Sequence, residues 1–133
     1  MANTFETLLK AARAQRDTAS QAVNTATAQL DEANQQLSDL ASAEEQASFG
    51  DDFGFAAGTY LRSLSLQRQR IISQLPNLEK KLALSRDELL DAFGECKKME
   101  FVRERQRLEI EAEEKRRDGT RLDEIAQRMT RGK

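Results

Sequence analysis

The sequence lacks the side chains on which most enzyme active sites depend. Its 133 residues include no histidine and no tryptophan, and Cys96 is the one cysteine. Without histidine there is no imidazole to act as a general base or as a metal ligand. A single cysteine excludes an internal disulfide and suits a reducing compartment. Because Cys96 lies on the apolar helical repeat described below, we interpret it as a buried structural thiol and not as a nucleophile.

Long apolar runs and ligand-binding motifs are also missing. Apolar stretches such as residues 53–57 are far shorter than the ~20 residues that a membrane-spanning helix needs. Residues 1–6 lack a basic region followed by an apolar one, which is the pattern of a secretory signal. Gly54 and Gly58 are not followed by the Lys-Ser/Thr pair of a phosphate-binding loop. Because the sequence has no membrane span, no secretory signal and a single cysteine, we expect a cytoplasmic protein.

The charged residues form no pattern typical of catalysis or of nucleic-acid binding. Glu109, Glu111, Glu113 and Glu114 spread over more than one helical face, and arginine and lysine surround them. They support neither a metal site nor an acid/base pair. Basic residues are interleaved with acidic ones, and Tyr60 is the only tyrosine, which argues against nucleic-acid binding. The sequence thus predicts a protein that is not an enzyme, with no cofactor, no metal and no small-molecule substrate.

What the sequence does have is an apolar repeat with alternating spacings of four and three residues. A 3.5-residue repeat keeps one narrow stripe facing one partner helix, which is typical of a coiled coil. We call its positions the seam; charged or polar residues interrupt it at Arg16, Glu44, Arg68 and Ser85. The apolar seam positions of the first half are Phe5, Leu9, Ala12, Ala19, Val23, Ala26, Leu30, Ala33, Leu37, Leu40 and Ala47. Those of the second half are Leu61, Leu64, Ile71, Leu75, Leu78, Leu82, Leu89, Ala92, Cys96 and Met99.

These two repeats predict an all-α fold in which two long helices form an antiparallel coiled-coil hairpin. We expect one coiled-coil domain over residues 1–133. Its first helix should span about residues 4–48, its glycine-rich turn about 49–58 and its second helix about 59–130.

Two residues predict irregularities in the second helix. Pro76 predicts a kink near Leu75 with the helix continuing, or else a short separate helix over residues 59–74. Gly119 predicts a break before a last helical segment. With the turn centred near Asp52, Leu40 should lie beside Leu64.

Charge and length set the two helices apart. Residues 1–60 carry nine acidic and three basic side chains, whereas residues 61–133 carry fourteen acidic and eighteen basic ones, so the two arms attract each other. The second helix is longer and continues past the first as an overhang. Residues 103–133 include eighteen charged residues out of thirty-one. An offset apolar set without a partner in a monomer follows there: Phe101, Leu108, Ala112, Leu122, Ala126 and Met129.

Two groups of apolar residues are candidates for contacts with other proteins. Four of the seven aromatic residues, namely Phe49, Phe53, Phe55 and Tyr60, gather at the expected hairpin tip. They form either a local cluster that caps the hairpin or an exposed contact site. Near the C-terminus an apolar stripe lies on a strongly charged helix: Leu122, Ile125, Ala126 and Met129. This stripe either docks into a groove or ring, or frays or self-associates.

The arrangement resembles one known family. Residues 122–128 read Leu-Asp-Glu-Ile-Ala-Gln-Arg. This is similar to the hydrophobic-Asp-Glu-hydrophobic-Ala-Gln-Arg segment of the flagellar export family FliJ and its injectisome relatives of the YscO type. The acidic-to-basic charge shift and the spacing from Tyr60 to this segment also fit, so the resemblance covers nearly the whole chain. Pro76 and Gly119 depart from the uninterrupted second helix of the family, which bears on its straightness more than on its identity.

The resemblance implies a function in flagellum biogenesis, protein transport and motility. Members of the family are small cytoplasmic coiled coils that resemble the central stalk of rotary ATP synthases. Their open end enters the hexameric ring of the export ATPase and promotes its assembly and activity. The rod also contacts the cytoplasmic domain of the membrane export gate, and members bind export chaperones. By this resemblance the protein would be cytoplasmic and peripherally associated with the membrane-embedded export apparatus.

The resemblance also implies two sets of contact residues. The set that would face the ATPase is Leu122, Asp123, Glu124, Ile125, Gln127, Arg128 and Met129, together with Phe5 and Leu9. The set that would face the export gate is Phe49, Phe53, Phe55, Tyr60 and Leu64.

Two alternatives remain open from the residues. One is a generic coiled-coil adaptor or a prefoldin-like chaperone arm, although residues 48–58 are too short for the strands of a prefoldin. The other is an export chaperone that escorts filament or hook subunits. The identity of the proteins that the chain binds would distinguish both alternatives from a stalk.

Overall fold

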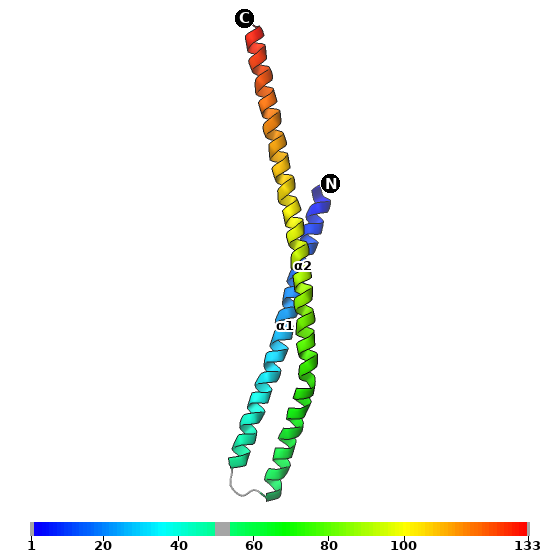
Figure 1. Ribbon diagram of the computed structural model, residues 1–133, viewed down its shortest axis with the longest axis vertical. Helices are drawn as coiled ribbons and strands as arrows, with labels where there is room; N and C mark the ends of the chain where they lie inside the picture. Colours follow the sequence, from blue (N-terminus) through cyan, green and yellow to red (C-terminus); the bar gives the residue numbers. More distant parts are fainter. Residues whose placement is uncertain (1, 50–53, 133) are drawn as a thin grey trace. The chain divides into compact units, whose positions relative to one another are not determined.

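A computed structural model describes residues 2–49 and 54–132 of the chain. It contains helix α1, Ala2–Phe49, and helix α2, Gly54–Arg131, which pack against each other (Figure 1). Contacts such as that between Glu44 and Arg68 join the end of α1 to the beginning of α2, so the packing is antiparallel. The described residues include no strand. The predicted all-α hairpin is therefore confirmed.

The chain divides into two compact units. Unit 1 consists of Met1–Arg13 and Gly94–Lys133, and unit 2 consists of Ala14–Phe93.

The core of unit 2 lies on the predicted seam. Ala26 and Ala33 of α1 and Leu64 and Leu82 of α2 are 1–7% exposed, and all four are seam positions. Small alanines opposite leucines let the two helices approach closely and exclude water. At about 25 cal/mol per Å² of apolar surface removed from water, these contacts supply most of the stability of the hairpin. Ser85, which interrupts the seam, is also buried, with 8% exposure.

Two charges that interrupt the seam pair with each other in unit 2. Arg68 Nη1 donates a hydrogen bond to Glu44 Oε2 across the two helices, at 3.1 Å. The Glu44 side chain is only 22% exposed, and its Oε1 is buried without a hydrogen-bond partner in the described part of the chain. Each of these residues therefore offsets part of the cost of placing the other beside an apolar seam.

The cross-helix contacts of unit 2 correct the expected register. Glu44 pairs with Arg68, and Gln29 accepts a hydrogen bond from Lys81 at 3.1 Å. The paired residue numbers add to 112 and 110, whereas a turn centred near residue 52 requires 104. Leu40 lines a groove together with Ile71, so the expectation that it lies beside Leu64 is wrong. The expected register requires the two helices to be symmetric about the centre of the turn. A repeating seam by itself does not distinguish this register from others.

The core of unit 1 joins the start of α1 to the middle of α2. Leu9 is fully buried, and Ala12 and Cys96 are 7% and 1% exposed. Cys96 is thus a buried thiol, as predicted. Two ion pairs flank this core: Arg13 Nε lies 3.4 Å from Glu100 Oε1, and Arg103 Nε lies 3.2 Å from Glu6 Oε1.

The helix boundaries differ from the expected ones mainly at the start of α2. This helix begins at Gly54, so residues 54–58 are helical and do not belong to the expected turn. Residues 50–53 of that turn lie outside the described residues. Each glycine lowers helix stability by about 1 kcal/mol relative to alanine. The long helix that follows Gly54 and Gly58 can offset this cost.

Helix α2 is also continuous at Pro76 and Gly119, and at Pro76 the helix continues as predicted. It runs through Pro76, so the alternative of a separate helix over residues 59–74 is wrong. It also runs through Gly119, and the expected break there is wrong. Proline lacks an N–H and clashes with the preceding turn, but seam residues on both sides of Pro76 keep α2 packed on α1 in unit 2.

Candidate functional site

The C-terminal part of unit 1 exposes an apolar stripe, which we call the C-terminal stripe. Its large members are Phe101, Leu108, Leu122 and Met129, with 68%, 52%, 67% and 71% of their surfaces exposed. They recur at intervals of seven or fourteen residues, with Lys115 at the missing position. A seven-residue apolar interval is the pattern of a coiled-coil seam. Nothing in unit 1 covers this seam, because the described residues 101–132 are exposed apart from the half-buried Glu113.

Ion pairs within the helix support the segment that carries the stripe. Arg107 lies 2.6 Å from both Glu104 and Glu111, and Arg116 lies 2.7 Å from Glu113. These pairs are three or four residues apart, the spacing that stabilises an isolated helix. The hydrogen bond from Arg107 lowers the pKa of the Glu104 carboxyl below its ordinary value, and the same contact raises the pKa of Arg107. Helicity in this segment is therefore supported by charge rather than by burial.

The residues that the resemblance assigns to the ATPase lie in different environments in the structure. Leu122 and Met129 are strongly exposed and Ile125 is 47% exposed, so these three side chains are available to a partner. The polar members of the set are exposed on the same helix: Asp123, Glu124, Gln127 and Arg128. Phe5 is half-buried, and Leu9 is fully buried in the core of unit 1. Leu9 can therefore support a contact surface but cannot form one.

The residues assigned to the export gate are also in different environments. Tyr60 is 52% exposed, whereas Leu64 is 6% exposed and belongs to the core of unit 2. Helix α1 ends at Phe49, and Phe55 lies in the first turn of α2. Phe53 lies outside the described residues.

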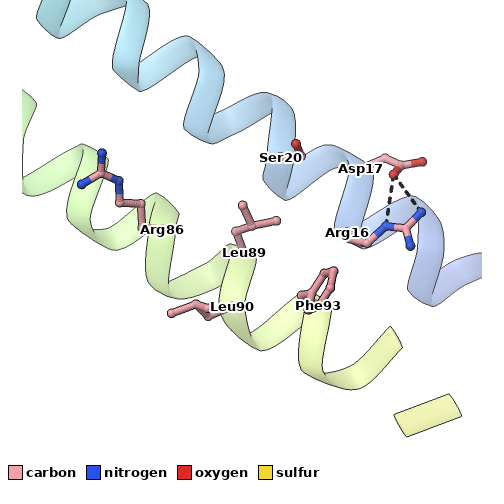
Figure 2. Close-up of a pocket in the computed structure, with 7 residues that line it drawn as sticks. All are labelled: Arg16, Asp17, Ser20, Arg86, Leu89, Leu90 and Phe93. Carbon is pink, nitrogen blue, oxygen red and sulfur yellow. Dashed lines mark hydrogen bonds and ion pairs between the residues drawn. The ribbon is translucent and has the colours of Figure 1, made fainter. Parts of the chain in front are cut away.

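Sequence reasoning missed a groove between α1 and α2 in unit 2. Its volume is about 580 Å³, and Figure 2 shows the side chains that line it: Arg16, Asp17, Ser20, Arg86, Leu89, Leu90 and Phe93. Leu90 and Phe93 are 69% and 47% exposed, and Arg16 pairs with its neighbour Asp17 at 3.3 Å. The signal for this groove was present, since Leu90 and Phe93 are large apolar residues of α2 that lie off the seam.

A second groove in unit 2 lies nearer the turn. Its volume is about 610 Å³, and it is lined by Gln36, Asp39, Leu40, Ala43, Gln67, Arg70, Ile71 and Gln74. Its lining is more polar than that of the first groove. In neither unit do the described residues include a cluster of histidine, cysteine and carboxylate groups suited to a metal ion. No helix among them is long and apolar enough to cross a membrane.

Comparison with known proteins gives one match. A family model described as "Flagellar FliJ protein" matches residues 55–133. The matched region is more than half of the chain and contains nearly all of α2, including the C-terminal stripe. Searches of curated proteins and of solved structures gave no match.

Proposed function

The chain belongs to the family of flagellar FliJ proteins, components of the flagellar export apparatus, and from this premise we propose that it is a non-enzymatic coupling stalk. In this function it binds the hexameric export ATPase and promotes ring assembly and ATP hydrolysis. It also links the ATPase to the cytoplasmic domain of the membrane export gate and to export chaperones. Its association with the membrane is then peripheral and runs through these partners.

The observation that supports this proposal most directly is the uncovered C-terminal stripe. Leu122 and Met129 are exposed by about two thirds on a helix whose charged residues keep it soluble. A large apolar side chain left in water gains roughly 1.5–3 kcal/mol when a partner buries it fully. A regularly spaced row of such side chains therefore suits insertion into a ring or groove of another protein.

The ATPase contact in this proposal consists of the exposed face near the C-terminus. Leu122, Ile125 and Met129 supply apolar contacts, and Asp123, Glu124, Gln127 and Arg128 supply polar contacts around them. Phe5, which is half-buried in unit 1, contributes from α1. Leu9 supports this end of α1 from within the core.

The export-gate contact in this proposal lies near the start of α2. Tyr60 supplies an exposed aromatic side chain, and Leu64 fixes this part of α2 on the core. Phe49, Phe53 and Phe55 are the further aromatic candidates for this contact.

ATP hydrolysis by the cognate export ATPase tests the proposal. We expect wild-type protein to raise the hydrolysis rate and to promote ring assembly, as judged by size-exclusion chromatography. The variant Leu122→Ala/Met129→Ala should lose most of this stimulation, because two exposed anchors are removed without loss of folding. Leu90→Ala is the matched control, since Leu90 is equally exposed but lies in unit 2. An active ATPase that responds to none of the proteins contradicts the stalk function.

The groove at Leu90 and Phe93 favours a second candidate function, that of an export chaperone. An apolar groove between two helices suits an amphipathic helix of an exported subunit. Purified filament and hook subunits should then bind the wild type and bind Leu90→Ala more weakly. Equal binding to both proteins, or binding to neither, argues against this function.

A further inference from the structure

The margins of the C-terminal stripe have a charge pattern that the composition of the segment does not explain. Residues 103–133 contain ten basic and eight acidic residues, so the segment as a whole is slightly basic. The seven-residue interval nevertheless places mostly acidic residues directly beside the stripe. One margin carries Glu104, Glu111 and Asp118, and the other carries Glu109, Arg116 and Asp123. Basic residues concentrate on the opposite face of the helix, among them Arg103, Arg117 and Arg131.

Ion pairs within the helix account for only part of this acidic margin. Glu104 and Glu111 share Arg107, and Glu109 lies 3.5 Å from Arg105. The three carboxylates stay 50–68% exposed in these pairs and remain accessible to a partner. Asp118 and Asp123 make no ion pair with any residue that the structure describes, and both are exposed.

A second copy of this chain does not match such margins. In a parallel coiled-coil pair Glu104 of one copy would face Glu109 of the other and Asp118 would face Asp123, and only Glu111 would face an opposite charge, Arg116. In an antiparallel pair Glu111 would face Asp118 or a second Glu111. Like charges in these positions destabilise the pair. The stripe therefore selects against self-association and favours a partner with the opposite charge.

We propose that the C-terminal stripe docks against an apolar helix or groove of the export ATPase that is rimmed by lysine and arginine. This inference rests on the proposed stalk function and adds the chemistry of the partner surface. The apolar stripe supplies most of the affinity. The acidic margins steer the encounter and fix the register, so binding weakens as salt concentration rises.

Two charge-matched variants of the full-length chain test this inference. The margin variant is Glu109→Gln/Asp118→Asn, and the control from the opposite face is Glu113→Gln/Glu114→Gln. Each variant removes two negative charges. Each also combines one carboxylate paired with arginine (Glu109 or Glu113) and one without an ion pair among the described residues (Asp118 or Glu114). Affinity for the purified ATPase is measured by calorimetry at low, physiological and high salt.

We expect the margin variant to bind about fivefold more weakly at low salt, since two rim contacts contribute about 0.5 kcal/mol each. Its affinity should also depend less on salt than that of the wild type. The control variant should stay within about twofold of the wild type in both respects. Equal losses in the two variants, or no loss in the margin variant, overturn the basic-rim inference while leaving the stalk function intact.

Two further results are decisive. Absence of wild-type binding to an active ATPase overturns the proposed function itself, and the inference with it. Sedimentation of the wild type as a dimer that Leu122→Ala converts to a monomer also overturns the inference, because the stripe would then accept a second copy. A monomer at all tested concentrations supports it.

Discussion

The two apolar seams of this chain obey the same repeat and lie in opposite environments. In unit 2, Ala26, Ala33 and Leu82 are 1–7% exposed because α1 and α2 cover each other. In unit 1, Leu108, Leu122 and Met129 are 52–71% exposed although their spacing is as regular. A seven-residue repeat therefore indicates a helix that needs a partner, but it does not say whether that partner belongs to the same chain.

The largest expected effect comes from comparing a charge placed on the buried seam with a charge placed on the exposed C-terminal stripe. Leu82→Asp should lower the free energy of unfolding by about 3–4 kcal/mol, because it leaves an unpaired carboxylate in a dry interface. Leu122→Asp should change it by less than about 0.5 kcal/mol, because the side chain is already in water. Chemical denaturation followed by circular dichroism measures both. Similar losses in the two variants would show that residue 122 is covered in the free protein and would remove the contrast.

Pro76 offers a way to sharpen the paired region. It is exposed and helical, and it removes one backbone hydrogen bond from α2. Pro76→Ala should therefore raise the free energy of unfolding by about 1–3 kcal/mol, as measured by thermal denaturation. No gain, or a loss, would mean that the packing of unit 2 depends on an irregularity at Pro76.

Gly119 offers the corresponding change in the unpaired region. A methyl group at this position meets no atom within 4 Å, so Gly119→Ala creates no clash. It should stabilise the local helix by about 0.5–1 kcal/mol. Amide hydrogen exchange should therefore slow in residues near 119 and stay unchanged in residues 14–93. Faster exchange near 119 would contradict a continuous helix there.

The smallest expected effect is a pH dependence confined to the unpaired region. The hydrogen bond from Arg107 lowers the pKa of Glu104 below 4.5 in the folded state. This contact therefore adds stability above pH 4.5, and the contribution is lost as the pH falls through the lowered pKa. Helicity near Glu104 should decline below about pH 4.5, and Arg107→Gln should weaken that decline. The difference between the circular dichroism spectra of the wild type and Arg107→Gln at each pH measures this effect. Arg86→Gln is a control from unit 2.

The seam was predictable from sequence because burial follows the apolar repeat closely. Each buried apolar residue that the structure describes, from Leu9 to Cys96, is a predicted seam position. The register was not predictable, because every heptad offers a similar row of leucines and alanines to the opposite helix. The pairing of Glu44 with Arg68 distinguishes the registers, and it depends on two side chains twenty-four residues apart.

The candidate site was predictable in part. Leu122, Ile125 and Met129 lie in the part of the second helix that the sequence predicts to extend past the first helix. They are exposed in the structure. Leu9 and Leu64 belong to the predicted seam and also to the predicted contact surfaces, and their place on the seam determines their burial. The groove at Leu90 and Phe93 required the structure, because it forms only where residues of α1 and α2 lie level with each other.

The salt-bridged helix that carries the C-terminal stripe has a thermodynamic consequence for recognition. Arg107 and Arg116 hold their glutamates within the same helix at 2.6–2.7 Å, so the free protein already has the shape that a partner would meet. Fixing a disordered residue costs roughly 1–2 kcal/mol of backbone entropy, and a preformed helix has lost that freedom before the encounter. A partner would therefore meet a preorganised helix, whose internal ion pairs favour affinity by keeping it rigid before the encounter.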